Sequence, residues 1–386
     1  MKDKLSYLCR QFRLRGELLV YRPIPSGHIN TAYYVALYDG TEVCQYLVQR
    51  INRRVFRDPV ALMHNVALIT EHLARKAPTA ERRRRLHFHH TAAGHNYLFL
   101  KQTPSGFVSR EDAPEAALDG DAWECWRVCN YVERSVTFEA GTGSETLLRM
   151  AGKAFGTFNR QLADFDANLL AETIPHFHDT VYRMNTLFDL VALDPMGRAR
   201  DCAPEIALLR EHRAFAGTLC RQLAAGELPL RVTHNDTKTN NALFDRDTLE
   251  PLVVIDLDTC MPGLACYDFG DSIRFAACAA GPADGMRLDL TRFRAYAEGY
   301  LSETDAILSE AELSSLPLGA AVMTLELASR YLADYLSGDR YFRIDAPDRN
   351  LRRARAQLAL FRDMLTHRDD MACILAEVRA AQRRGV

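Results

Sequence analysis

Short runs of aromatic and β-branched residues fill the first third of the chain and are typical of β-strands. Residues 33–38 and 43–51 form two such runs, and Asp39-Gly40 between them favours a tight hairpin turn. Residues 59–74 follow with apolar positions at helical spacing, and Asp58 precedes them as a cap. This pattern predicts a strand, a turn, a strand and a helix.

Two further runs with strand character occupy residues 97–101 and 126–132. The polar segment 103–121 between them contains proline and glycine, which favour irregular structure. It therefore predicts a long loop between two strands. The complete order of elements resembles that of a small nucleotide-binding lobe.

Helical periodicity dominates from Glu145 onward. It predicts one helix over residues 147–162 and another over residues 205–225, with further helices from about residue 290 to the end. Short apolar runs at residues 243–244 and 252–255 interrupt this pattern and predict β structure. The predicted fold class is α+β, with a small β-rich lobe over residues 1–132 and a large, mainly helical lobe over residues 133–386.

The composition adds limits on the class of protein. Of the 386 residues, 48% are apolar and 25% charged, which is usual for a globular chain, and the net charge is −2. No strong field attracts nucleic acid or an anionic membrane, and no apolar run approaches the length of a membrane span. The ten cysteines form no C-x-x-C pair, so we expect reduced thiols and a cytoplasmic location. The sequence indicates no particular oligomeric state.

The run from His234 to Asn241 carries the strongest chemical signal, because it has the form H-x-D-x-K-x-x-N. A second aspartate, Asp256, ends the apolar run that follows. In ATP-dependent phosphoryl transfer, one carboxylate orients or receives the hydroxyl proton, which predicts Asp236 as the catalytic group. An amide oxygen and a second carboxylate hold Mg²⁺ on the ATP phosphates, which predicts Asn241 and Asp256 as metal ligands. The spacing matches that of protein-kinase-like enzymes.

Neighbouring residues have more than one interpretation. Lys238 could neutralise the transferred phosphoryl group or be a solvated loop lysine. Asp258 could be a second metal ligand, a substrate contact or an ordinary loop aspartate. Asp268 begins a literal D-F-G, but it lies far from Asp236 and follows no β run, so we expect a structural role for it. His234 is also predicted to be structural.

The first lobe offers weaker signals for phosphate binding. Gly27 lies between two segments of strand character, but a full G-x-G-x-x-G is absent. The strand 43–51 lacks the lysine usual in kinases, so Gln49 or Arg50 must take that role, and alternation along the strand allows only one of them. Glu71 could pair with Arg50 or face solvent.

An apolar helix is predicted over residues 321–336, with Glu326, Arg330 and Asp334 on one face. These three residues could form a solvent-facing ladder of salt bridges. Alternatively, the face borders the cleft and Arg330 binds substrate.

Together, these motifs resemble those of the aminoglycoside-phosphotransferase-like kinase superfamily, which includes choline, homoserine and methylthioribose kinases. Within it, the chain is most similar to the bacterial N-acetylhexosamine 1-kinases. The resemblance rests on the blocks 26–30, 47–52 with 55–56, 234–241 with Asp256, and 329–332 with 338–339 and 341–342.

The resemblance implies a two-lobed, protein-kinase-like fold that uses ATP and Mg²⁺. It implies transfer of the ATP γ-phosphate to the anomeric hydroxyl of N-acetylglucosamine or N-acetylgalactosamine. His28, Arg330 and Tyr341 would lie near this sugar. The backbone of Asn130, Tyr131 and Val132 would meet adenine.

Two other classes of function remain as alternatives. The chain could phosphorylate another hydroxyl, as on homoserine, choline or a different sugar. A non-catalytic nucleotide-binding protein would be expected to lack at least one of Asp236, Asn241 and Asp256, and all three are present.

Overall fold

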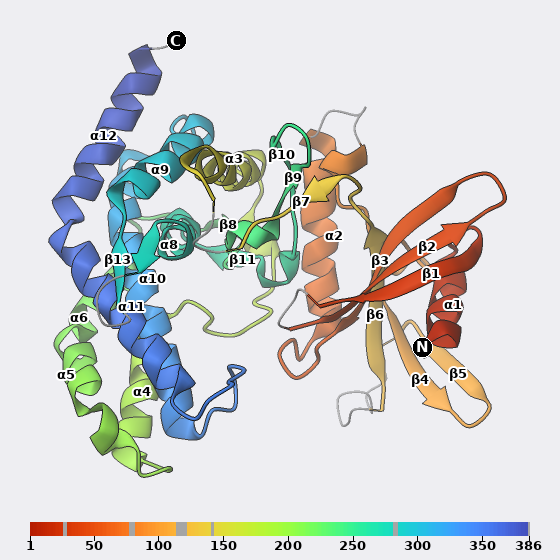
Figure 1. Cartoon of the computed structure of the whole chain (residues 1–386), viewed down its shortest axis with the longest axis horizontal. Coiled ribbons are helices and arrows are strands. Elements are labelled where there is room, and N and C mark those ends of the chain that lie inside the picture. The colour runs from red at the N-terminus through yellow and green to blue at the C-terminus, as the bar shows by residue number, and fades with distance from the viewer. Residues whose placement is uncertain (26–28, 77–81, 113–121, 140–142, 281–284, 385–386) are drawn as a thin grey trace. The chain divides into compact units, whose positions relative to one another are not determined.

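The computed structural model describes residues 1–25, 29–76, 82–112, 122–139, 143–280 and 285–384. The chain divides into two compact units (Figure 1). Unit 1 comprises Met1–Ser135, Leu169–Ile174 and Ile255–Cys260, and unit 2 comprises Val136–Asn168, Pro175–Val254 and Met261–Val386. Unit 1 is built on a β-sheet and unit 2 is mainly helical, which confirms the α+β class.

Unit 1 contains one antiparallel sheet with the strand order β1-β2-β3-β6-β4-β5. The strands are β1 (Glu17–Ile24), β2 (Thr31–Tyr38), β3 (Val43–Ile51), β4 (Leu98–Thr103), β5 (Gly106–Arg110) and β6 (Glu124–Asn130). The predicted hairpin is confirmed, since β2 and β3 pair up to Tyr38 and Val43. Asp39 holds the turn by accepting hydrogen bonds from the backbone of Thr41 and Glu42.

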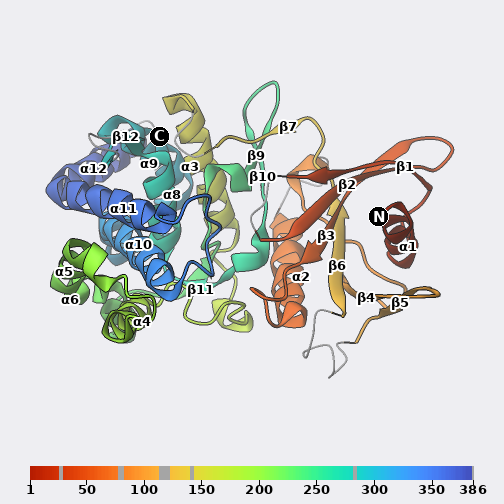
Figure 2. The same ribbon diagram turned by 60° about the horizontal axis from the view of Figure 1, so that its bottom comes forward.

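Helices α1 (Lys2–Gln11) and α2 (Pro59–Lys76) cover opposite faces of this sheet (Figures 1 and 2). The α1 face holds the apolar core, formed by the buried residues Leu5, Leu8, Cys9, Phe12, Val35, Leu37, Val48, Leu98, Leu100, Trp126 and Val128. Strand alternation turns Arg127 to the α2 face, where its guanidinium contacts the sulfur of Met63. Asp58 caps α2 as predicted, accepting from the backbone of Val60 and Ala61.

Three features of unit 1 differ from the sequence prediction. The expected loop 103–121 contains strand β5, which pairs with β4 after a turn at residues 104–105. The last predicted strand ends at Asn130 rather than at residue 132. Helix α1 was not predicted, and strand β1 was indicated only as a segment of strand character before Gly27, because most of β1 is exposed and shows no alternating burial pattern.

Unit 2 has a core of long helices with short strands beside them. The longer helices are α3 (Glu145–Gln161), α4 (Thr180–Leu193), α8 (Ala265–Ala276), α9 (Leu290–Thr304), α10 (Glu310–Ser337), α11 (Arg349–Thr366) and α12 (Arg368–Arg384). Strand β8 (Arg231–Thr233) pairs with β11 (Met261–Gly263), β9 (Ala242–Asp245) with β10 (Pro251–Val254), and β12 (Cys278–Ala280) with β13 (Met286–Leu288). The two-residue strand β7 (Ser135–Val136) spans the boundary between the units. No helix in the described ranges is long and apolar enough to cross a membrane.

The predicted helix over residues 205–225 is wrong, because the structure divides it into three pieces. These are α5 (Ala203–Glu211), α6 (Arg213–Ala216) and α7 (Thr218–Ala224). Gly217, which precedes the third piece, has low helix propensity and favours the break. The D-F-G tripeptide lies inside α8, a buried helix that the sequence analysis did not predict.

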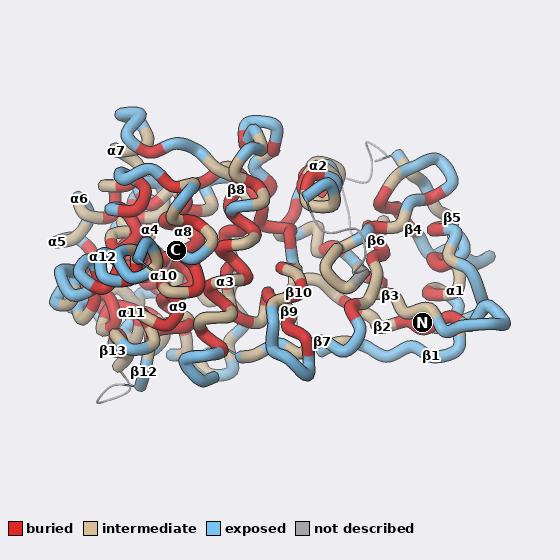
Figure 3. Tube along the Cα trace, turned by 90° about the horizontal axis from the view of Figure 1, so that it is seen from above, coloured by how far each residue is buried: buried red, intermediate tan, exposed pale blue. Residues whose placement is uncertain are grey.

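Helices α8 and α10 form the buried centre of unit 2 and appear mostly red in Figure 3. They approach closely because glycines meet at their crossing. A Cβ atom at Gly319 would lie 2.2 Å from the carbonyl oxygen of Cys266, and one at Gly270 would lie 2.4 Å from that of Gly319. This close crossing fixes the position of α8, which carries the residues that hold the candidate site.

We expect Gly319→Ala to lower the free energy of unfolding by about 1–3 kcal/mol, because the added methyl group forces the two helices apart. Gly217→Ala is the control, since its Cβ would meet side-chain atoms of Arg221 and Val181 at 3.0 Å and 3.2 Å and a backbone oxygen, that of Ala214, only at 3.8 Å. The control should change stability by less than about 1 kcal/mol. Denaturant titration measures both values. Equal effects of the two substitutions would contradict the close crossing.

Candidate active site

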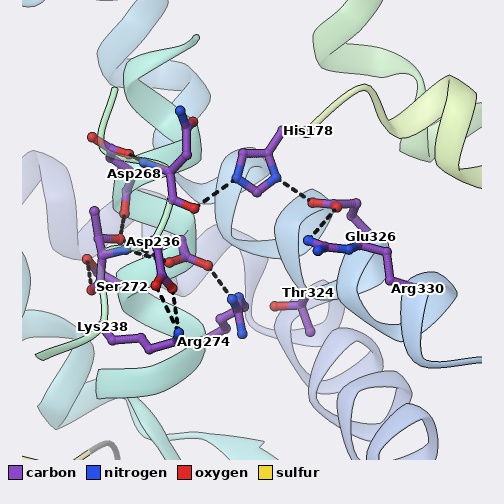
Figure 4. Close-up of polar contacts among 12 residues, drawn as sticks. His178, Asp236, Lys238, Asp268, Ser272, Arg274, Thr324, Glu326 and Arg330 are labelled. Carbon is purple, nitrogen blue, oxygen red and sulfur yellow. Dashed lines mark hydrogen bonds and ion pairs between the residues drawn. The ribbon is translucent and has the colours of Figure 1, made fainter. Parts of the chain in front are cut away.

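The loop after β8 presents Asp236 next to two polar side chains, of which Figure 4 shows Lys238. The ammonium of Lys238 lies 2.7 Å and 2.9 Å from the two carboxylate oxygens of Asp236. The amide nitrogen of Asn241 donates to the backbone carbonyl of Asp236 at 2.8 Å and to its carboxylate at 3.2 Å. The structure therefore brings three sequence-predicted site residues together within unit 2.

The environment of Asp236 keeps its carboxyl group ionised. Burial would raise its pKa, but the charge and hydrogen bond of Lys238 outweigh burial and hold the pKa below its usual range. The pKa of Lys238 shifts in the opposite direction: burial would lower it, but the charge of Asp236 raises it. At neutral pH the pair is a carboxylate beside an ammonium, with about a fifth of the Asp236 side chain exposed.

Asn241 meets a requirement for a metal ligand. Since its amide nitrogen is committed to Asp236, its amide oxygen is the atom left for another partner. An amide oxygen beside a carboxylate is the kind of hard donor that Mg²⁺ prefers. The residues present in this loop therefore fit Mg²⁺.

Helix α8 holds the backbone of the loop through two buried carboxylates. Asp268 accepts hydrogen bonds from the backbone N–H groups of His234 at 2.9 Å and Asn235 at 2.8 Å. Asp271 accepts from the backbone N–H of Thr237 at 2.7 Å and also pairs with Arg274. The predicted structural role of Asp268 is confirmed, because both of its oxygens bind the loop that carries Asp236.

A second polar cluster lies on α10 and the segment before α4 (Figure 4). Glu326 is 1% exposed and contacts Nδ1 of His178 at 2.8 Å and Arg330 at 3.3 Å. Burial would raise the pKa of Glu326, but His178 and Arg330 together lower it to about 2. The alternative of a solvent-facing ladder is therefore wrong for this helix face.

Aromatic rings surround the guanidinium of Arg330. Its central carbon lies 4.9 Å from the ring centre of Phe177, 5.7 Å from that of Tyr341 and 5.8 Å from that of Phe342. The third residue of the predicted helix face, Asp334, accepts hydrogen bonds from the backbone N–H groups of residues 340–342. Asp334 thus fixes the loop that places Tyr341 beside Arg330.

In unit 1, a separate buried network forms around Asp258, which is 3% exposed. One carboxylate oxygen pairs with the buried guanidinium of Arg127, and the other accepts from Asn30 at 2.6 Å. Arg127 also donates to Gln49 at 3.0 Å. Both oxygens of Asp258 are engaged by unit 1 itself, and its contact with substrate stays a prediction.

Asp256 lies two residues earlier in the same segment and is exposed. Its backbone is left-handed, with φ of 61°, a conformation that costs energy in any residue except glycine. Two side chains of unit 1 hold the segment in place, since Thr173 donates to the Asp258 carbonyl and Asn65 donates to the Cys260 carbonyl. The strained backbone and its supports give Asp256 a defined position in unit 1.

The structure separates the two candidates on β3. Gln49 lies on the sheet face with Arg127 and Asp258, whereas Arg50 lies on the other face. Arg50 pairs with Glu124 at 3.0 Å, so the suggested pairing with Glu71 is wrong.

The other predicted nucleotide contacts lie at or just after the end of β6, or precede β2. The backbone N–H of Asn130 donates to His87, and that of Tyr131 donates to Gln45. Val132 is buried, and its carbonyl accepts from Ser135. Gly27 and His28 lie outside the described residues.

Sequence reasoning did not identify Arg127, His178 or Glu326 as parts of these networks, although Glu326 was placed on the correct helix face. Their partners lie 131, 57 and 148 positions away in the chain. A weak signal existed for Arg127, since it is a charged residue between two apolar neighbours, Trp126 and Val128, in β6. His178 has no such signal in its neighbours.

Comparison with known proteins places this geometry in context. The family model described as "Phosphotransferase enzyme family" matches residues 20–306, which is most of the chain.

Solved structures with the same fold include three kinases. A putative aminoglycoside phosphotransferase from Ralstonia eutropha JMP134 is 11% identical and has a TM-score of 0.53, with 98% of each chain covered. A spectinomycin phosphotransferase in complex with ADP and spectinomycin is 12% identical, with a TM-score of 0.52 and coverage of 96% of this chain and 98% of that one. An ethanolamine kinase from Plasmodium vivax is 13% identical, with a TM-score of 0.50 and coverage of 89% and 84%. These likenesses confirm the predicted two-lobed kinase-like fold.

We expect Asp268→Asn to lower the free energy of unfolding by about 1–3 kcal/mol, because an amide cannot accept from both backbone N–H groups with equal geometry. Burial raises the pKa of Asp268 from 3.8 to about 6, so the folded protein binds a proton that the unfolded chain releases. The stabilisation from this proton is complete below about pH 4 and is lost as the pH rises to about 6.

The stability difference between wild type and Asp268→Asn should therefore shrink between about pH 4 and pH 6. Denaturant titration at several pH values measures this difference. A difference that grows over the same interval would show that the Asp268 pKa is lowered rather than raised.

Proposed function

The chain belongs to the phosphotransferase enzyme family, and on that premise we propose that it transfers the γ-phosphate of ATP to the anomeric hydroxyl of an N-acetylhexosamine. The observation that carries the phosphotransfer part of this proposal is the ionised carboxylate of Asp236, held by Lys238 and Asn241 on a rigid loop. The sugar rests on the sequence resemblance, supported by the aromatic surroundings of Arg330.

Asp236 would orient the acceptor hydroxyl and receive its proton. Catalysis of phosphoryl transfer depends mainly on positioning and charge stabilisation, so a carboxylate with a low pKa is suited to orient the hydroxyl. The proton need only move late, when the oxygen–phosphorus bond is forming. Lys238 keeps Asp236 ionised and places a positive charge beside the point of transfer.

We propose that Asn241 and Asp256 hold Mg²⁺ through the amide oxygen and the carboxylate. Bound Mg²⁺ would neutralise the phosphate oxygens of ATP. Each residue fits this role in its own unit. Asn241 has its amide nitrogen committed elsewhere, and Asp256 presents an exposed carboxylate on a constrained backbone.

For ATP, we propose contacts from Gly27, from Gln49 and from the backbone of residues 130–132. Gln49 is preferred over Arg50, because Gln49 shares the face of Arg127 and Asp258. Arg50 is committed to Glu124 on the opposite face.

For the sugar, we propose contacts from His28, Arg330 and Tyr341. Arg330 offers hydrogen-bond donors, and the rings beside it offer flat apolar surfaces suited to a pyranose. We also propose Asp258 as a substrate contact, and it holds the segment that carries Asp256.

A panel of acceptors tests the substrate. We expect ATP consumption with N-acetylglucosamine or N-acetylgalactosamine, and phosphate on the anomeric carbon of the product. Phosphorus and proton NMR of the product identify the phosphorylated position. Turnover of choline, homoserine or another alcohol without anomeric phosphorylation would overturn the sugar and retain the phosphotransferase.

Two conservative substitutions test the roles of the aspartates. Asp236→Asn should reduce kcat by at least about 100-fold while ATP binding stays nearly unchanged, because the carboxylate acts mainly in the transition state. Asp256→Asn should instead make activity depend strongly on Mg²⁺ concentration.

Steady-state kinetics over a range of Mg²⁺ concentrations separates the two effects, and Asp268→Asn serves as the comparison. The metal assignment would be wrong if Asp268→Asn showed the Mg²⁺ dependence and Asp256→Asn did not.

A further inference from the structure

His178 connects the Glu326 carboxylate to the backbone immediately before Asp236 (Figure 4). Its Nδ1 lies 2.8 Å from a carboxylate oxygen of Glu326, and its Nε2 lies 3.2 Å from the backbone carbonyl oxygen of Asn235. The imidazole is buried, with 7% of its side chain exposed. Water therefore has little access to replace either contact.

Both partners of His178 are hydrogen-bond acceptors. A backbone carbonyl has no proton to donate, and the other oxygen of Glu326 accepts from the guanidinium of Arg330 at 3.3 Å, which marks Glu326 as a carboxylate independently of His178. A neutral imidazole carries only one N–H, so it would leave a lone pair facing one of these oxygens. Only the imidazolium, with protons on both nitrogens, satisfies both contacts.

Charged groups of both signs surround the ring: the Glu326 carboxylate favours a positive charge there, and the nearby guanidinium groups oppose it. Glu326 is the carboxylate in contact with it, and Arg330 shares that carboxylate at 3.3 Å. Arg183 also lies close enough to Glu326 to lower its pKa, and Tyr267 packs against the imidazole at 5.6 Å between ring centres. The cluster thus contains one anion that is stabilised by several cations.

The bond at Nε2 holds a particular peptide unit. The carbonyl of the Asn235–Asp236 peptide accepts from His178, and its N–H donates to Nδ1 of His234 at 3.3 Å. Asn235 has a left-handed backbone with φ of 63°, a conformation that asparagine tolerates better than most residues other than glycine. Since Asp268 holds the Asn235 N–H, both backbone groups of this residue are fixed.

We propose that His178, as an imidazolium, is a positioning residue that fixes the Asn235–Asp236 peptide and thereby aims the Asp236 carboxylate. The proposal rests on the proposed function, because the reaction requires Asp236 to be placed against an acceptor hydroxyl. The Glu326 carboxylate anchors this imidazolium and also Arg330. One buried anion therefore supports both the catalytic loop and the candidate acceptor contact.

Substitutions of His178 and of Glu326 should have different kinetic effects. His178→Gln removes the double donor without touching Arg330, so kcat should fall by about 10- to 100-fold while KM for ATP and for the acceptor changes by less than about two-fold. Glu326→Gln removes the shared anchor, so it should lower kcat and also raise the acceptor KM. The double variant should have nearly the kcat of His178→Gln, because both changes break one connection.

His367→Gln is the matched control, because Nδ1 of His367 also contacts a carboxylate, that of Asp370, at 2.8 Å but on the exposed surface. It should retain wild-type kinetics. The acceptor in every assay is the one that the wild-type enzyme phosphorylates fastest. If that acceptor is not an N-acetylhexosamine, the sugar proposal fails and the role of His178 is still tested.

A purely structural role for His178 would lower the thermal midpoint and leave kcat of the folded protein unchanged, and that result would overturn the proposal. A loss confined to the acceptor KM would overturn it equally.

The protonation state is tested on the unmodified protein, independently of any acceptor and of how a variant folds. In ¹⁵N-histidine-labelled protein at neutral pH, both ring nitrogens of His178 should carry protons and have similar shifts. One protonated and one unprotonated nitrogen would overturn the imidazolium. Comparison with labelled His178→Gln identifies the signals, and where that variant does not fold, a neutron structure of the wild type locates the same protons.

Discussion

The close crossing of α8 and α10 is the constraint on which the candidate site of unit 2 depends. Gly270 and Gly319 allow the two helix backbones to meet, and α8 is thereby held at a fixed depth in the core. From that position Asp268 and Asp271 bind consecutive parts of the loop backbone. A carboxylate that accepts backbone N–H groups specifies geometry directly, so the placement of Asp236 follows from the packing of two helices.

Helix α10, which forms the other half of this crossing, also supplies charged side chains that position residues near the site. Its buried face presents Glu326 to His178 and Arg330, and its end presents Asp334 to the loop that follows. The helix is apolar on nearly all sides, and each of these charged groups has partners that satisfy it. The charges are retained in the core because each one organises a segment that lacks regular structure.

The sequence predicted features that depend on neighbouring residues. The β2–β3 hairpin follows from strand residues around Asp39-Gly40, and the start of α2 follows from Asp58 before Pro59. The contacts among Asp236, Lys238 and Asn241 join residues at most five positions apart. Their spacing in the sequence was therefore enough to predict that they lie together.

Long-range partnerships escaped prediction, because residue type does not identify a partner more than a hundred positions away. Arg127 with Asp258 and His178 with Glu326 are of this kind. The break at Gly217 was missed for a related reason, since the apolar spacing of residues 205–225 continues across a residue that does not favour a helix. The roles of Gln49, Asp256 and Tyr341 in binding remain predictions from motif and resemblance.

The attachment of residues 340–342 to Asp334 has a consequence for how this chain can diversify. Asp334 binds their main-chain N–H groups, which every residue except proline possesses, and it ignores the side chains. The identities of these three residues can therefore drift while the course of the loop is preserved. Natural or engineered substitutions can therefore replace the aromatic side chains of this loop beside Arg330 singly, while the backbone that carries them keeps its course.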